Sequence, residues 1–193
     1  MDIKKYKGLI TIVTMFIAFS IIGWIWELLY DFLKHGFIAN HGVLHGPWLP
    51  IYGFGGIIIY LLLNRFRKHS LIVFMGSFVF CTIIEYCTGW FLETYRFNKW
   101  WNYKYMPFNL DGRICLLASI FFGISGLACI YIFTPRIKDF IEKHDLKKVA
   151  IICLVFVSII AIDWGYSTKY PNIVKKYKVI DASKVNEIKL FKN

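Results

Sequence analysis

The stretch LITIVTMFIAFSIIGWIWELLYDFL, residues 9–33, is an apolar block in which Glu27 is the first charged residue. A helix needs about 20 apolar residues to cross roughly 30 Å of hydrocarbon, so this block is long enough to span a bilayer. Lys4, Lys5 and Lys7 precede it, as basic residues precede the core of a signal peptide. However, the block exceeds the about 7–15 residues of such a core, and no A-x-A-like cleavage site follows. We therefore expect an uncleaved first helix.

Four further apolar blocks follow, at about residues 48–63, 70–95, 114–133 and 149–166. Hydrophobic residues make up 58% of the 193-residue chain and mean hydropathy is +0.53, whereas soluble domains average about 45–50% apolar residues. The alternation typical of membrane strands is absent. The sequence predicts an all-α integral membrane protein, a bundle of about five transmembrane helices. Residues 1–167 would form the transmembrane domain, and residues 168–193 a lysine-rich tail.

The net charge of +11 would suit nucleic acid, but basic residues in a membrane protein usually mark cytoplasmic loops. With five spans, three basic segments fall on one side: Lys4, Lys5 and Lys7; Arg65, Arg67 and Lys68; Arg136, Lys138, Lys143, Lys147 and Lys148. We therefore expect a cytoplasmic N-terminus, a multi-pass protein of the cell membrane, the lipid bilayer as partner, and no nucleic acid. The lysine-rich tail conflicts with this topology, which places it outside.

Several chemical sites are absent or weakly indicated. The five cysteines lie in apolar blocks at no metal-ligand spacing, so they predict neither a metal site nor a disulfide. We expect His41 and His45 to be exposed loop residues. The alternative is a zinc site formed with a glutamate, but nothing in the spacing is diagnostic of one. No G-x-x-x-x-G-K-[ST] motif occurs. We expect no cofactor, and any energy for transport would come from a partner such as a separate ATP-binding subunit, from an ion gradient, or from no source at all.

Polar residues inside the apolar blocks recur at helical spacing. Gly23 lies four residues before Glu27, Gly89 lies midway between Glu85 and Glu93, and Ser167 follows Asp163 by four, so each set shares one helix face. A charge near the bilayer centre costs a few kcal/mol and usually faces other helices or a wet cavity. An inert ion pair, or a protonated carboxyl group, is the alternative for the glutamates.

Two linking segments complete a candidate site. HGVLHGPWLPIYGFGG (41–56) is rich in glycine and proline and predicts a re-entrant-like segment before the second helix, tolerated only where protein or water satisfies its backbone. NKWWNYKYMPFNLDGRIC (98–115) carries interfacial aromatics and Arg113, the natural counter-ion of one glutamate. Under the five-span topology these residues converge on the outer membrane face. The candidate polar intramembrane site is Glu27, His45, Tyr52, Glu85, Glu93, Asn109, Arg113 and Asp163.

Four ordered motifs carry a resemblance: GWIWELLY (23–30), NHGVLHGPWLPIYGFGG (40–56), EYCTGWFLETYRF (85–97) and WWNYKYMPFNLDGRICL (100–116). They resemble the bacterial ABC-transporter permease family labelled CmpB-like (ABC transporter type IV), over most of residues 20–120, and IDWGYS (162–167) is similar to that family's last span. The family tends to have Arg at His41 and Asp at Asn102. The resemblance implies a membrane transport component that works with a separate ATP-binding subunit.

Three functions stay open from the sequence. A transport component of five helices would need to form a homo-oligomer or pair with another membrane chain. A membrane-embedded enzyme acting on a lipid or lipid-linked substrate would use Glu27, Glu85 and Glu93 as acids and bases, with Arg113 holding a phosphate or carboxylate. A non-catalytic sensor or assembly factor would need the glutamates only for folding. No catalytic residue is predicted.

Overall fold

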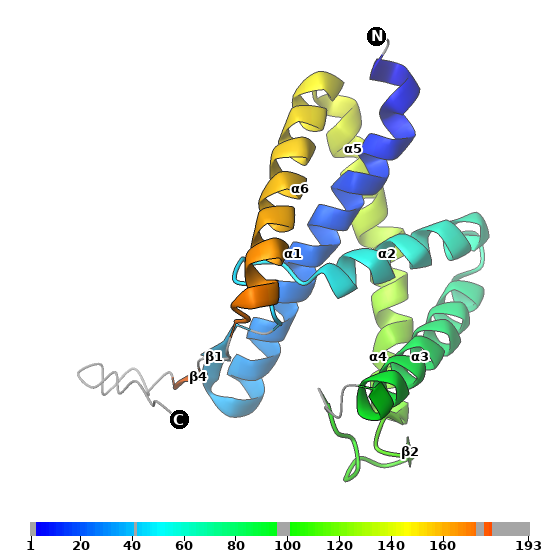
Figure 1. Ribbon diagram of the computed structural model, residues 1–193. Helices are drawn as coiled ribbons and strands as arrows, with labels where there is room; N and C mark the ends of the chain where they lie inside the picture. The colour runs from blue at the N-terminus through cyan, green and yellow to red at the C-terminus, as the bar shows by residue number, and fades with distance from the viewer. Residues whose placement is uncertain (1–2, 41, 96–100, 173–175, 179–193) are drawn as a thin grey trace, which may run out of the picture. The chain divides into compact units, whose positions relative to one another are not determined.

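The computed structural model describes residues 3–40, 42–95, 101–172 and 176–178, and this part of the chain is mostly helical (Figure 1). Four of its helices are long and apolar enough to cross a membrane, at Ile3–Leu33, Ser70–Tyr95, Leu116–Lys143 and Leu146–Lys169, and a shorter apolar helix spans Pro50–Phe66. The prediction of an all-α membrane protein is confirmed. His41 and residues 96–100 lie outside the described residues.

The chain divides into two compact units. Unit 1 comprises Met1–Phe54 and Phe140–Asn193, and unit 2 comprises Gly55–Asp139. The two boundaries between the units fall inside helices α2 (Pro50–Leu63) and α5 (Thr134–Lys143). The division into a domain of residues 1–167 and a tail of residues 168–193 stays a prediction.

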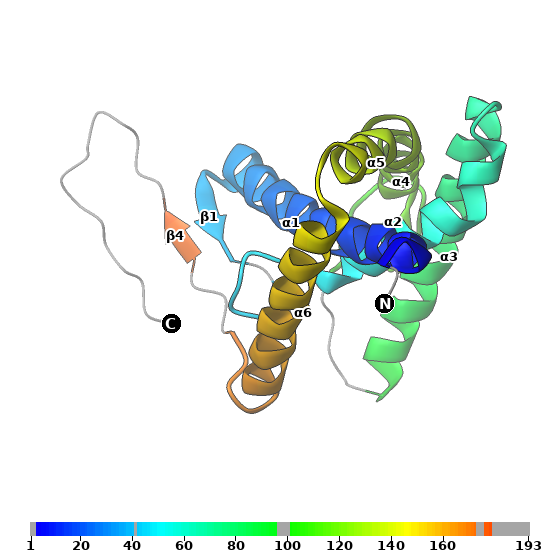
Figure 2. The same cartoon turned by 90° about the horizontal axis from the view of Figure 1, so that it is seen from above.

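In unit 1, α1 (Lys7–His35) and α6 (Leu146–Lys169) run in the same direction (Figure 1). Near their amino-terminal ends, Lys7 Nζ lies 3.4 Å from Glu142 Oε1, and the Thr14 hydroxyl lies 3.3 Å from Cys153 Sγ. Beyond their carboxyl-terminal ends, strand β1 (Phe37–Ala39) pairs antiparallel with β4 (Lys176–Lys178) (Figure 2). The N-terminus and the turn before α6 therefore lie at one end of unit 1, and β4 lies at the other.

The segment from Asn40 to Leu49, between β1 and α2, has no regular secondary structure among its described residues. The Leu49 N–H donates to the Ser20 carbonyl at 2.9 Å, and Ser20 lies near the midpoint of α1. Pro50 follows as the first residue of α2, a position where its missing N–H costs nothing. Gly53 packs so closely on Phe16 and Ser20 that an added Cβ would overlap them. Helix α2 therefore begins beside the middle of α1, which agrees with the re-entrant-like segment that the sequence predicts.

In unit 2, α3 (Ser70–Tyr95) packs along α4 (Leu116–Leu127). Small residues on α4 make this possible: Gly123 faces the Phe74 ring, and Gly126 faces Ser77. Small residues let two membrane helices approach closely. Between the helices, β2 (Asn109–Leu110) and β3 (Ile114–Cys115) form a two-stranded hairpin.

The fourth span continues beyond the apolar block that predicts it. After α4 comes a π-helical turn, Ala128–Phe133, and then α5. Pro135 explains the turn, because proline has no N–H to donate, and the preceding Thr134 N–H reaches back five residues to the Cys129 carbonyl. The predicted end near residue 133 is where hydropathy falls; the helix continues to Lys143 as an amphipathic extension.

The packing of α3 on α4 generates a stability prediction. In Gly126→Ala the new methyl group would overlap Ser77, whose short side chain is fully buried and has no room to move. We expect the free energy of unfolding to fall by about 1–3 kcal/mol, as for other overpacked sites, measured by thermal unfolding in mild detergent. Gly55→Ala is the matched control, since nothing lies within 4 Å of its Cβ. Equal melting temperatures for the two variants would contradict this packing.

Candidate functional site

In unit 1, the Asp163 carboxylate holds the irregular segment in place. Asp163 comes from α6, and only 10% of its side chain is exposed. Its Oδ2 accepts hydrogen bonds from the Gly46 N–H and from Trp48 Nε1, both at 2.9 Å, and both of its oxygens lie 3.1 Å from the His45 backbone nitrogen. Hydrogen bonds to an ionised acceptor are about twice as strong as neutral ones. This one side chain therefore satisfies the N–H groups of consecutive residues that have no helix to bond to.

His45 and Ser167 extend this arrangement. The Ser167 hydroxyl donates to Asp163 Oδ1 at 3.0 Å, and His45 Nδ1 lies 3.0 Å from the same hydroxyl. Because the serine proton goes to the carboxylate, Ser167 accepts from an Nδ1–H of His45. In the neutral imidazole the other nitrogen, Nε2, carries the lone pair, and it accepts no hydrogen bond from the part of the chain that the structure describes. With 44% of its side chain exposed, His45 offers a proton acceptor at the edge of the cluster.

The carboxyl-terminal half of α1 provides further polar contacts. The Tyr52 hydroxyl, on α2, donates to Glu27 Oε1, and Gly23 one turn earlier leaves room for the Tyr52 ring. Trp24 Nε1 donates to Asn40 Oδ1 at 2.7 Å, and Asn40 Nδ2 donates to the His45 carbonyl at 3.2 Å. Glu27, His45, Tyr52 and Asp163 thus all belong to the surroundings of one irregular segment.

In unit 2, Arg113 joins α3 to the loop before α4. Its Nε and Nη2 donate to Glu93 Oε2 at 3.0 and 2.8 Å, and its Nη1 donates to Asp111 Oδ2 at 2.9 Å and to the Tyr86 hydroxyl at 3.1 Å. Only 17% of the Arg113 side chain and 21% of the Glu93 side chain are exposed. The hydrogen bonds that Arg113 donates to Glu93 raise the pKa of Arg113 above its usual value. All three guanidinium nitrogens are engaged, and four of the five N–H groups donate to these partners.

Glu85 and Asn109 hold the same loop in different ways. Glu85 Oε1 accepts from the Tyr103 hydroxyl at 2.9 Å, while its buried Oε2 has no hydrogen-bond partner among the described residues. The exposed Asn109 donates to the carbonyls of Lys104 and Met106, and its Oδ1 accepts from the Gly112 N–H. Asn109 thus shapes a turn, and Glu85 is the carboxylate with an oxygen available to another group.

The structure distributes the eight predicted site residues over two clusters. Glu27, His45, Tyr52 and Asp163 lie in unit 1, and Glu85, Glu93, Asn109 and Arg113 lie in unit 2. Their common position at the outer face stays a prediction. The expected pairing of Arg113 with a glutamate is present, and its partner is Glu93. No group of three or more His, Cys, Asp or Glu in the described ranges is arranged to hold a metal ion.

Several residues of these clusters are missing from the predicted site. They are Trp48, Tyr86, Tyr103, Asp111 and Ser167. Ser167 had a signal, since it follows Asp163 by one helical turn. The aromatic residues had none that separates them from an interfacial belt, because only the fold shows which indole or hydroxyl group meets a carboxylate.

One family model matches residues 14–168, most of the chain, and the family is described as "Putative ABC-transporter type IV". No curated protein and no solved structure matches the chain.

The Asp163 contacts predict a local opening. Asp163→Asn removes the charge and replaces one acceptor oxygen by an NH2 group, so the amides of His45 and Gly46 keep at most one neutral amide oxygen in place of the carboxylate. We expect roughly 10- to 100-fold faster hydrogen exchange at these amides, because bonds to a charged group contribute about 1.5–3 kcal/mol. Exchange followed by mass spectrometry measures it. Asp111→Asn, in unit 2, is the control, and unchanged exchange in Asp163→Asn would refute the role of the carboxylate.

The Arg113–Glu93 pair predicts non-additive substitutions. Arg113→Gln and Glu93→Gln each leave a partly buried charge without its partner, so each should lower the melting temperature. The double variant should be no less stable than the poorer single variant, because the second substitution removes the stranded charge. Thermal unfolding in detergent checks this, with the exposed Lys104→Gln as control. Strictly additive losses would show that the two side chains do not interact.

Proposed function

Since the chain belongs to the ABC-transporter type IV family, we propose that it is the membrane component of a transporter whose substrate passes along the polar cluster of unit 1. The observation that carries this proposal is the irregular segment Asn40–Leu49, which ends beside the midpoint of α1. Transporter sites are commonly built from discontinuous membrane segments, whose exposed backbone groups bind substrate or ions.

The orientation follows from the charges at the two ends of unit 1. Lys4, Lys5 and Lys7 lie at the same end as the lysines around the turn before α6. Basic residues of short loops usually face the cytoplasm, so we place this end inside a bacterial cell. Asp163, near the carboxyl-terminal end of α6, then lies toward the outer leaflet, and the C-terminal tail lies outside.

The cluster of unit 2 has a different part in the proposal. Arg113 donates four hydrogen bonds, to Glu93, Asp111 and Tyr86, which suits a fixed link between α3 and its loop better than a phosphate site. Energy must come from elsewhere, since the chain has no P-loop. We infer a separate ATP-binding subunit, with a second membrane chain or another copy of this one to complete the path.

A second candidate, an enzyme acting on a lipid-linked substrate, is favoured by one observation: the Asp163–Ser167–His45 hydrogen bonds leave an exposed imidazole Nε2 as a base. His45→Gln tests it. An enzyme would lose activity and accumulate its substrate, visible in the membrane lipid profile by mass spectrometry. A transport component would leave that profile unchanged, so this variant separates the two functions.

The transport proposal predicts a stable complex. The tagged chain, extracted from its native host in mild detergent, should co-purify a protein that mass spectrometry identifies by its P-loop. Gly126→Ala, which acts on folding, should lower the recovery of both proteins together, whereas Asp163→Asn should retain the complex and lose ATP-driven uptake. Repeated purification of the folded chain without any ATP-binding protein would argue strongly against the proposal.

A further inference from the structure

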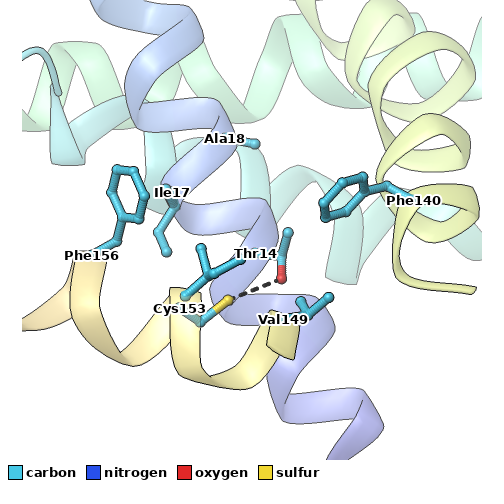
Figure 3. Close-up of a pocket in the computed structure, with 8 residues that line it drawn as sticks. Thr14, Ile17, Ala18, Phe140, Val149, Cys153 and Phe156 are labelled. Carbon is cyan, nitrogen blue, oxygen red and sulfur yellow. Dashed lines mark hydrogen bonds between the residues drawn. The ribbon is translucent and has the colours of Figure 1, made fainter. Parts of the chain in front are cut away.

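A shallow cavity of about 130 Å³ lies in unit 1 between α1 and α6 (Figure 3). Phe140, which belongs to the part of α5 that lies in unit 1, also borders it. Its floor is formed by the buried side chains of Ile17, Val149 and Cys153, and its rim includes Phe140 and Ile152, which are 44% and 53% exposed. A buried floor with an exposed rim describes a depression on the surface of these helices.

The cavity offers nothing to a polar ligand. Its two heteroatoms belong to Thr14 and Cys153, and the Thr14 hydroxyl already donates to the Ile10 carbonyl at 2.7 Å and contacts Cys153 Sγ, as Figure 3 shows. The volume is below the about 300 Å³ at which pockets begin to enclose a compact small molecule. An apolar chain that enters from the surrounding bilayer fits both properties.

The depth of the cavity matches a phospholipid. Along α1 the cavity begins at Thr14, seven residues after Lys7, and along α6 it begins at Val149, two residues after Lys147. At 1.5 Å per residue its upper edge therefore lies about 3–10 Å below these lysines. The headgroup layer of a bilayer is about 5–8 Å thick on each side, so an acyl chain begins within that range. A lipid whose phosphate lies level with Lys7 and Lys147 therefore brings the upper part of its chain to Thr14 and Cys153.

The charge at this end selects the headgroup. Within residues 3–7 and 140–148 there are six lysines, all exposed, and two acids, Glu142 and Asp145, a net charge of +4. Glu142 lies beside Lys7, and Asp145 caps α6 by accepting from the Lys147 N–H at 2.8 Å. Both acids thus have local partners, and the net charge at this end of α1 and α6 is positive. Basic clusters at the ends of membrane helices attract anionic headgroups.

We propose that this cavity binds one acyl chain of an anionic phospholipid whose phosphate is held by the lysines at the start of α1 and α6. The site lies at the opposite end of unit 1 from Asp163, so it is independent of the transport proposal. It provides this end of α1 and α6 with a lipid anchor of defined chemistry.

A photoreactive phosphatidylglycerol, with a diazirine on the upper part of its acyl chain, tests the site on the full-length chain in nanodiscs of phosphatidylcholine. Crosslinks mapped by mass spectrometry should fall in residues 14–18 and 149–156. Labelling should fall when unlabelled phosphatidylglycerol replaces part of the phosphatidylcholine in the nanodisc. It should not fall when more unlabelled phosphatidylcholine is added. Crosslinks spread evenly over the apolar helices, or equal competition by both lipids, would overturn the proposal.

Two variants separate the contribution of the lipid's acyl chain from that of its headgroup. Lys147→Gln with Lys148→Gln should reduce labelling by roughly 30-fold, because each lysine near a membrane surface contributes about a factor of five. Ala18→Leu, which fills the cavity, should abolish labelling at residues 149–156 with the lysines intact. Lys104→Gln, in unit 2, is the charge control. Labelling that depends on the lysines but survives in Ala18→Leu would show headgroup attraction alone, and the cavity would have no role. The crosslink map of the unaltered protein decides the matter if a variant does not fold.

Discussion

The satisfaction of backbone hydrogen bonds in an apolar surrounding is the constraint on which this structure depends. Within a helix the backbone groups bond to one another, but the described residues between Asn40 and Leu49 are not part of a helix. Asp163 solves it for them by accepting from two consecutive backbone amides and the Trp48 indole, while the Ser20 carbonyl accepts from Leu49. An unsatisfied group in hydrocarbon costs several kcal/mol. The buried acid thus fulfils a structural requirement and at the same time creates the polar site.

In the cluster of unit 2, charged side chains satisfy one another's hydrogen bonds. Arg113 bridges two carboxylates and a tyrosine hydroxyl, and the Trp101 indole donates to the Arg113 carbonyl at 2.7 Å. Gly89 lies beside this arrangement, where a Cβ would make ordinary van der Waals contact with the Arg113 stem and the Trp101 ring. The loop before α4 is therefore attached to α3 by many bonds to one residue. Glu85 differs from its neighbours because one of its oxygens is buried without a partner in the described chain.

Hydropathy and helical spacing are enough to predict the membrane class and the approximate spans, because both properties are local. They also indicate that Arg113 meets a glutamate, but they do not decide between Glu85 and Glu93, which lie two turns apart on one face. The contacts of Asp163 with residues 117 and 118 positions away depend on how α6 packs on α1. The continuation of α4 into α5 was missed for another reason: the charged residues after Phe133 mark where the apolar surroundings end, and a helix is free to extend beyond them.

The common direction of α1 and α6 has a consequence for the short helix between them. Between two crossings of a bilayer in the same sense, a chain must cross an odd number of times. Helix α3 and the continuous helix from α4 to α5 would account for two of these crossings, so the five-span topology needs α2 as the third. The 14 residues of α2 and the three-residue 3-10 turn Asn64–Phe66 that continues it cover about 27 Å, a little less than the hydrocarbon thickness. That topology therefore leaves only the last few ångströms of depth to the irregular segment before α2.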